Sequence, residues 1–373
     1  MSLSPFNFNN DIVDLGPQTL ITSTWTNNTN DLNVETSYTS SIQGGDTGML
    51  SPTSSGMFYI DVYNAITSST TAEVQLAVAY GNHLGSGSPD FTNDTGSLGV
   101  GASRVIYGQY RNLVFDNEVS KFKFGDHTPE GIYIINVNRG RYKQKLSPGS
   151  LNLHISGSPV EGTGSSGAST HGGIIHLTDD SVTRGALVDD PRYFESDKLG
   201  GSYIIVSGSN GTQNGTSPNQ LTIETNASCF GYFYPNAGLI ILNGDAFSAS
   251  FGTQASNNAF NNGNQTTYDK PHQKLFNAIV GGGTFIVDTE EQINSKFYFV
   301  RARNSEFNYT NNESFTDSDN RVLHSTMQFN PKVFITTVGL YNNAAELVAV
   351  AKLSQPVAKD FTKEALIRVK LDY

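Results

Sequence analysis

The 373-residue chain is about two to three times as long as an ordinary domain, which leaves room for two or three folded units. Only 15% of its residues are charged, and its 22 Phe, 17 Tyr and 37 Gly favour strands and tight turns over helices. The formal net charge of −11 argues against direct binding to nucleic acid, which depends on clustered Lys and Arg. We therefore predict a mainly β protein made of several β-sandwich-like or β-barrel-like modules, with one or two short helices.

The first quarter of the chain is acidic. Residues 1–103 contain nine carboxylates and neither Lys nor Arg, whereas the remainder contains 23 basic and 25 (34 − 9) acidic residues. Such a surface is either a docking face for a basic partner or a solvated surface that keeps the chain soluble. Both interpretations place a boundary at Ser103/Arg104, so we predict an acidic N-terminal β module over residues 1–103. Within it, residues 57–63 and 72–80 alternate around a Ser/Thr-rich turn, which predicts a β-hairpin.

Residues 104–156 follow as a predicted β segment. Residues 104–115 are amphipathic both as a strand and as a helix, and their pattern leaves both alternatives open. Residues 150–156 alternate clearly, with Leu151, Leu153 and Ile155 on one face. The low-complexity stretch 157–172 is then a Gly/Ser-rich loop or linker.

A central β domain is predicted over residues 173–300. Its clearest feature is a hairpin at residues 229–244, in which two apolar runs flank a Pro-Asn-Ala-Gly turn. The same hairpin contains Cys229, the single cysteine, which excludes an internal disulfide and is predicted to be a buried packing residue. Asp269 is a candidate N-cap for a short helix with Pro271 in its first turn.

Residues 301–373 are predicted to form a C-terminal β module. Residues 333–353 contain two alternating runs around Asn342-Asn343, which predicts a second hairpin. The last strand places Ala365, Ile367 and Val369 on one face, and we expect it to be paired because unpaired edges invite aggregation.

The search for chemistry yields only weak candidates. His171, His176, Asp179 and Asp180 are the best local metal-ligand cluster, but we favour the simpler interpretation that they are polar residues at a strand end. The carboxylate pairs are typical of turns rather than of glycoside hydrolysis; they are Asp179-Asp180, Asp189-Asp190 and Glu290-Glu291. The glycine clusters at 99–104 and 281–283 do not open a helix after a strand, so they do not predict phosphate binding. We therefore assign no catalytic, cofactor-binding or metal-binding residue, and we predict that the chain is not an enzyme.

Neither a signal peptide nor a membrane span is predicted. The N-terminus lacks a basic region followed by an apolar core, and no apolar stretch approaches the roughly 20 residues that a transmembrane helix needs. We expect synthesis and folding in a cytoplasm.

The C-terminal third carries a resemblance to a known family. The segments NSEFNYTNNESF, NPKVFITTVGLYNNAAELVAVAKLSQPV and KEALIRVKLDY, within residues 304–373, resemble the C-terminal module of virion structural proteins from T4-like contractile-tailed phages, notably those of cyanobacteria. GLYNNAAELVAVAKL is also similar to a looser pattern of phage tail-collar and tail-fibre attachment domains, although its turn lacks the usual glycine. YGQYRNLVF, KFKFG and IYIINVNRGRYKQKLSPGSLNLHIS, within residues 107–156, resemble blocks of the same proteins.

The resemblance covers about half of the chain and implies a place in the virion, after synthesis in the host bacterial cytoplasm. The implied function is a non-catalytic subunit of the tail or baseplate that joins neighbouring tail proteins or fibres. Its implied partners are other virion proteins, with several copies in a symmetric assembly. Two alternatives remain: a neck, collar or head decoration protein, and a receptor-binding adhesin that recognises glycan.

Overall fold

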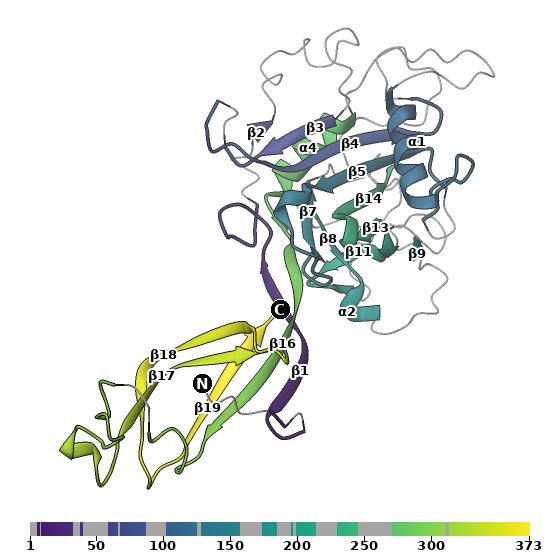
Figure 1. Ribbon diagram of the computed structural model, residues 1–373. Coiled ribbons are helices and arrows are strands. Elements are labelled where there is room, and N and C mark those ends of the chain that lie inside the picture. Colours follow the sequence, from purple (N-terminus) through teal and green to yellow (C-terminus); the bar gives the residue numbers. More distant parts are fainter. Residues whose placement is uncertain are drawn as a thin grey trace. The chain divides into compact units, whose positions relative to one another are not determined.

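The chain is mainly β, as its composition predicts. A computed structural model describes the following residues: 6–7, 9–32, 38–39, 59–65, 68–86, 102–124, 128–156, 174–184, 195–196, 199–213, 230–244, 271–309 and 313–373. These residues form long antiparallel sheets and few helices (Figure 1).

The chain divides into two compact units. The larger unit comprises residues 21–291, and the smaller unit combines residues 1–20 with residues 292–373. The five segments predicted from the sequence do not coincide with these units. In particular, the boundary expected at Ser103/Arg104 falls inside helix α1 (Ala102–Phe115), and strands on either side of it share one sheet.

The larger unit is built on an 11-stranded sheet. The order of its main path is β15-β7-β8-β11-β13-β14-β5-β4-β3-β2, and β12 pairs with β11 at its side. The bounds are β2 (Tyr38–Thr39), β3 (Tyr59–Tyr63), β4 (Val74–Asn82), β5 (Gly131–Val137), β7 (Asn152–Ser156), β8 (Ile174–Asp179), β11 (Tyr203–Ser209), β12 (Thr212–Gln213), β13 (Gly231–Tyr234), β14 (Leu239–Asn243) and β15 (Phe285–Ile286). Outside this sheet lie β6 (Lys145–Leu146), β9 (Glu195–Ser196), β10 (Gly200–Gly201), α2 (Ser181–Arg184), and the 3₁₀ turns η3 (Arg139–Arg141) and η4 (Pro235–Ala237).

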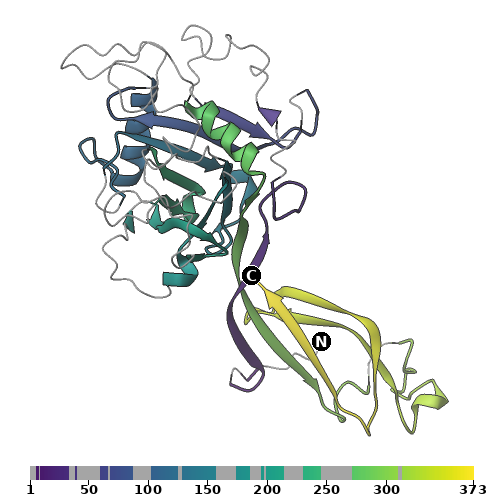
Figure 2. The ribbon, with the colours of Figure 1, turned by 180° about the vertical axis from the view of Figure 1, so that it is seen from behind.

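Two helices cover this sheet, α1 and α4 (Pro271–Gly282), and Figure 2 shows α4 from the other side. The central strand β5 explains why both are needed, because its alternating side chains enter two separate cores. Ile132 and Ile134 join a cluster that contains residues of α1, whereas Tyr133 and Ile135 join the cluster that contains residues of α4. A strand that is buried on both faces needs a cover on each.

Helix α1 decides the alternative that the sequence left open at residues 104–115. Its buried residues Ser103, Ile106, Tyr107 and Val114 recur at helical spacing, so one side of the helix packs against the sheet. The predicted β segment 104–156 therefore begins with a helix. Helix α4 confirms the other predicted helix and starts at Pro271, as expected.

Residues 25–32 are hydrogen-bonded to β15, the strand at one end of the same sheet. The Trp25 indole donates a hydrogen bond to the carbonyl of Phe285, and the Phe285 amide donates to the Asp31 carboxylate. The Leu32 amide also donates to the Phe285 carbonyl. Residues about 260 positions apart are thus joined inside the larger unit.

The smaller unit contains two sheets with few strands. One has the order β1 (Ile12–Ser23), β16 (Asp288–Ala302) and β19 (Ala365–Asp372), and the other consists of β17 (Val333–Tyr341) and β18 (Leu347–Lys359). A 3₁₀ turn, η5 (Ser325–Met327), precedes β17. Strands β1 and β16 belong to both units, and β16 pairs with β6 near its start before it pairs with β19.

The hairpins predicted at residues 57–80, 229–244 and 333–353 are all present as β3–β4, β13–β14 and β17–β18. In the second, Gly238 has φ +64°, which is the positive φ expected of its turn. The last strand is paired, because β19 lies beside β16. Cys229, Asp269 and the whole loop 157–172 lie outside the described residues.

Candidate assembly surface

The residues of the predicted metal cluster separate in the structure. His176 is exposed on β8 and stacks on His154 of β7, with ring centroids 3.9 Å apart. Asp179 and Asp180 are buried, and His171 lies outside the described residues. Among the residues that the structure describes, no group of three or more metal-ligand side chains occurs.

The two buried aspartates accept hydrogen bonds from the main chain. Asp179 accepts from the Gly149 amide at 2.9 Å and from the Ser181 amide at 3.1 Å, and Asp180 accepts from the Ile204 amide at 2.9 Å. Burial raises the pKa of Asp179, although these hydrogen bonds oppose the shift. Both carboxylates therefore hold loops in place at the end of β8.

The other candidates also have structural roles. Glu290 forms an ion pair with Lys145 at 2.7 Å, which reinforces the pairing of β16 with β6. Gly282 and Gly283 lie at the C-terminal end of α4, so they end a helix rather than open one. Asp189 and Asp190 lie outside the described part of the chain.

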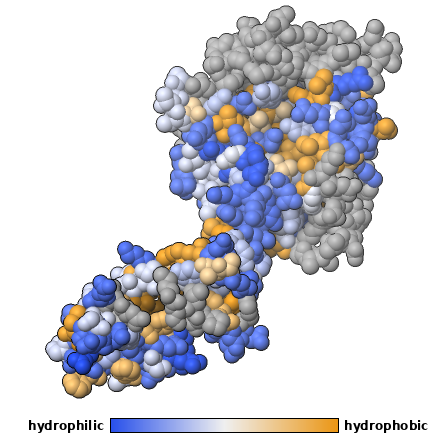
Figure 3. Space-filling model, in the orientation of Figure 1, coloured by the Kyte–Doolittle hydropathy of each residue, from blue (hydrophilic) through white to orange (hydrophobic). Residues whose placement is uncertain are grey.

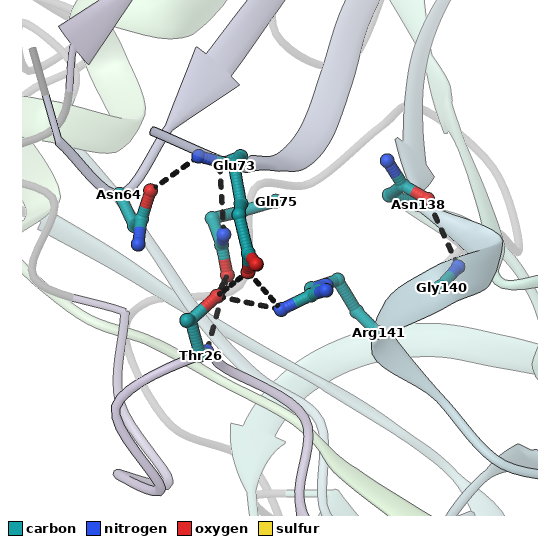
Figure 4. Close-up of polar contacts among 7 residues, drawn as sticks. All are labelled: Thr26, Asn64, Glu73, Gln75, Asn138, Gly140 and Arg141. Carbon is teal, nitrogen blue, oxygen red and sulfur yellow. Dashed lines mark hydrogen bonds and ion pairs between the residues drawn. The ribbon is translucent and has the colours of Figure 1, made fainter. Parts of the chain in front are cut away.

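One polar cluster was not predicted from the sequence. Figure 4 shows Thr26 between Gln75, Glu73 and Arg141. Arg141 Nη1 donates to Thr26 Oγ1 and to Glu73 Oε2, each at 2.7 Å, and the Thr26 hydroxyl lies 2.9 Å from Gln75 Oε1. The Glu73 amide in turn donates to Asn64 Oδ1. The cluster ties the segment after β1 to the start of β4 and to the turn η3.

This cluster also bears on the acidic first quarter. Glu73 pairs with Arg141, and Asp14 lies 3.5 Å from Lys296, so two of the nine early carboxylates have basic partners from later in the chain. These two early carboxylates are therefore not part of an isolated acidic face. Because residues 1–103 contain no Lys or Arg, any Lys or Arg that pairs with an early carboxylate must come from later in the chain.

Several apolar side chains are exposed on the outer side of the β17–β18 hairpin. We call this side the outer ribbon face and define it by Phe334, Gly339, Tyr341, Leu347 and Val350. Phe334 is 61% exposed, Leu347 53% and Val350 58%. A Cβ at position 339 would lie 3.0 Å from the Tyr341 ring and 3.1 Å from Leu347, so these side chains lie over the glycine. Figure 3 shows hydrophobic residues, in orange, at the surface of the smaller unit.

The inner side of the same hairpin forms the core of the smaller unit. Val338 and Leu340 of β17 pack with Ile367 and Val369 of β19, and each of the four remains 7–8% exposed. An isolated two-stranded hairpin is marginal in water. With so small a core on one side, the hairpin gains further stability if its other side is also covered.

The turn of this hairpin is held by Asn342. Its Oδ1 accepts from the amides of Ala344 and Glu346, and Ala345 has φ +62° where a glycine is usual. The missing glycine therefore does not change the hairpin, because the asparagine side chain fixes the turn.

The two units differ in charge. The smaller unit has 10 basic and 10 acidic residues, which leaves 13 (23 − 10) basic and 24 (34 − 10) acidic residues in the larger unit. The whole formal charge of −11 thus belongs to the larger unit. The outer ribbon face stands on a neutral unit, where long-range repulsion does not oppose a contact.

No family model matches the chain, and neither a curated protein nor a solved structure is significantly similar to it. Within the described residues, no helix is both long enough and apolar enough to cross a bilayer.

Proposed function

We propose that the chain is a non-catalytic structural subunit of a bacteriophage virion, and that it joins neighbouring proteins of the tail or baseplate. The observation that carries the proposal is the outer ribbon face, an apolar surface on a neutral unit with a small core. Surfaces of this kind mark sites of protein association.

The resemblance to phage virion proteins supports the same part of the chain. GLYNNAAELVAVAKL, residues 339–353, supplies Gly339, Tyr341, Leu347 and Val350 of the outer ribbon face. The segment that resembles attachment domains is thus the segment that exposes apolar side chains. Each strand of the hairpin also has one edge without a partner among the described strands.

Electron cryomicroscopy of intact virions tests the position of the chain. We expect its density in the tail or baseplate, with the outer ribbon face covered by a neighbouring protein. Density at the neck or head would instead favour a collar or decoration protein. Mature virions that contain no copy of the chain would overturn the proposal.

A pair of matched substitutions tests the surface. Val350→Ser is expected to reduce incorporation into particles at least tenfold without changing the circular dichroism of the free protein. Val105→Ser removes a side chain that is 68% exposed on α1 of the larger unit, and it serves as the control. Equal incorporation of both variants would contradict a role for the outer ribbon face.

A further inference from the structure

Helix α1 packs against β4 (Figure 1), and Tyr107 of α1 lies close to Gly81 near the end of β4. The cationic side chains of this region are His83, Arg104, Arg111 and Lys121. His83 follows the last residue of β4, and its amide donates to the Glu130 carbonyl at 2.7 Å. Arg104 and Arg111 are seven residues apart in α1, so they lie two turns apart on one side of the helix. Lys121 comes from the segment that follows the helix.

Tyr107 brings these residues together. It lies between the two arginines on the same side of α1, and its ring packs edge-on against His83 with centroids 5.5 Å apart. The Tyr107 hydroxyl accepts a hydrogen bond from the Phe122 amide at 3.1 Å, which places Lys121 beside the same group. Gly81 allows this approach, because a Cβ there would lie only 2.8 Å from the Tyr107 nitrogen.

The charges of this group act on one another. The pKa of His83 is lowered, first by burial and then by the positive charges of Lys121, Arg111 and Arg104. Burial disfavours the charged imidazole, and the cationic side chains close to it add to that cost. They are also unusual in a unit whose acidic residues outnumber its basic residues by 24 to 13.

Two polar atoms of the group are buried and unpaired within the part of the chain that the structure describes. Arg111 Nε and His83 Nδ1 have no hydrogen-bond partner among the described residues. A buried polar atom without a partner is costly, and most such atoms in folded proteins are satisfied. An oxygen-bearing anion would accept from the guanidinium and imidazole and would also offset the surrounding charge.

The geometry points to a binding site for a small phosphate-bearing anion, formed by His83, Arg104, Arg111 and Lys121. A dianion suits the site better than a single carboxylate, because the guanidinium of Arg111 and the ammonium of Lys121 are both available to a doubly charged ligand. A nucleic-acid backbone is a poor candidate, since the larger unit carries the whole net charge of −11. The site lies in the larger unit, so a negative result for the outer ribbon face would not count against the site, and the reverse also holds.

Isothermal titration calorimetry of the full chain with inorganic phosphate tests the site at low ionic strength. We expect saturable 1:1 binding that sulfate competes for and acetate does not. Arg111→Gln is expected to weaken the binding at least tenfold, whereas Arg321→Gln, the same change at an exposed position of the smaller unit, leaves it unchanged.

A second variant keeps the test decisive if Arg111→Gln fails to fold. Lys121 is exposed, so Lys121→Gln is expected to fold normally and to weaken phosphate binding about threefold. In parallel, NMR titration is expected to show a higher pKa for His83 with phosphate bound than without it. No saturable binding of phosphate or sulfate, or equal binding by wild type and both variants, would overturn the site.

Discussion

The larger and smaller units of this chain differ in how they use apolar side chains. Among the residues that the structure describes, the larger unit encloses two clusters of 27 and 14 buried hydrophobic residues, many with no exposed surface, and the unit carries a strongly negative charge. The smaller unit encloses a cluster of four, leaves each slightly exposed, and places further apolar residues on the outside of long strands. The larger unit thus buries extensive apolar clusters, whereas the smaller unit has a small apolar core and leaves further apolar side chains exposed.

The largest effect is expected from deleting core side chains. Ile240→Ala removes a fully buried side chain from β14 and should cost about 4 kcal/mol, whereas Ile367→Ala in the smaller unit should cost about 2 kcal/mol. Urea denaturation measures both losses. Trp25, the single tryptophan, reports the larger unit by fluorescence, and circular dichroism reports both units. Equal losses would remove the contrast between the two cores.

Glycine substitutions test how tightly each unit is packed. Gly238 has φ +64°, and a Cβ there would lie 2.6 Å from the Tyr142 ring, so Gly238→Ala should cost about 2–3 kcal/mol through clash and backbone strain. Gly16 in the smaller unit has φ +67° and open space around its Cβ direction. Gly16→Ala should therefore cost only about 1 kcal/mol. A larger loss for Gly16→Ala, measured by the same denaturation, would contradict the looser packing of the smaller unit.

Ion pairs provide a third comparison. Arg141 and Glu73 share the polar cluster around Thr26, and we expect a double-mutant cycle to give a coupling of about 1 kcal/mol. Arg301 and Glu364 form a more exposed pair in the smaller unit, for which the coupling should be about 0.3 kcal/mol. Both couplings should fall as salt is added. A stronger coupling for the exposed pair would contradict the expectation that the less exposed ion pair of the Thr26 cluster interacts more strongly.

Among the single substitutions, the smallest effect is expected at the hairpin turn. Ala345→Gly should stabilise the smaller unit by about 0.5–1 kcal/mol, because glycine adopts a positive φ without strain. Ala344→Gly is the matched control and should destabilise the unit by a similar amount, since position 344 has no positive φ. Thermal denaturation followed by circular dichroism measures both. Destabilisation by Ala345→Gly would mean that the turn relies on its alanine methyl.

Local patterns predicted the hairpins well, because alternation and turn residues lie within a few positions of one another. The β13–β14 hairpin follows from two apolar runs around Pro235 and Gly238 alone. The amphipathic residues 104–115 were ambiguous, because the choice of helix depends on a sheet face that distant strands create.

The candidate surfaces were harder to predict. The hairpin at 333–353 was recognised, but only the structure distinguishes its inner residues, such as Val338, from exposed ones, such as Val350. A register shift at Leu340/Tyr341 moves Leu347 to the outer side, where simple alternation would not place it. The pairing of Thr26 with Arg141 joins residues 115 positions apart, and no local pattern encodes it.

Strand β16 also determines when the smaller unit can fold. Its partner β1 is synthesised first, yet β1 begins at Ile12 and β16 begins at Asp288. A ribosome that adds ~5–20 residues per second needs roughly 15–55 s to cover that distance. During this delay β1, with its exposed Val13, Leu15 and Leu20, has no β16 to pair with, while the larger unit between them is completed. Because β16 and the strands that follow it are made last, the smaller unit is the last part of the chain that can be completed during translation.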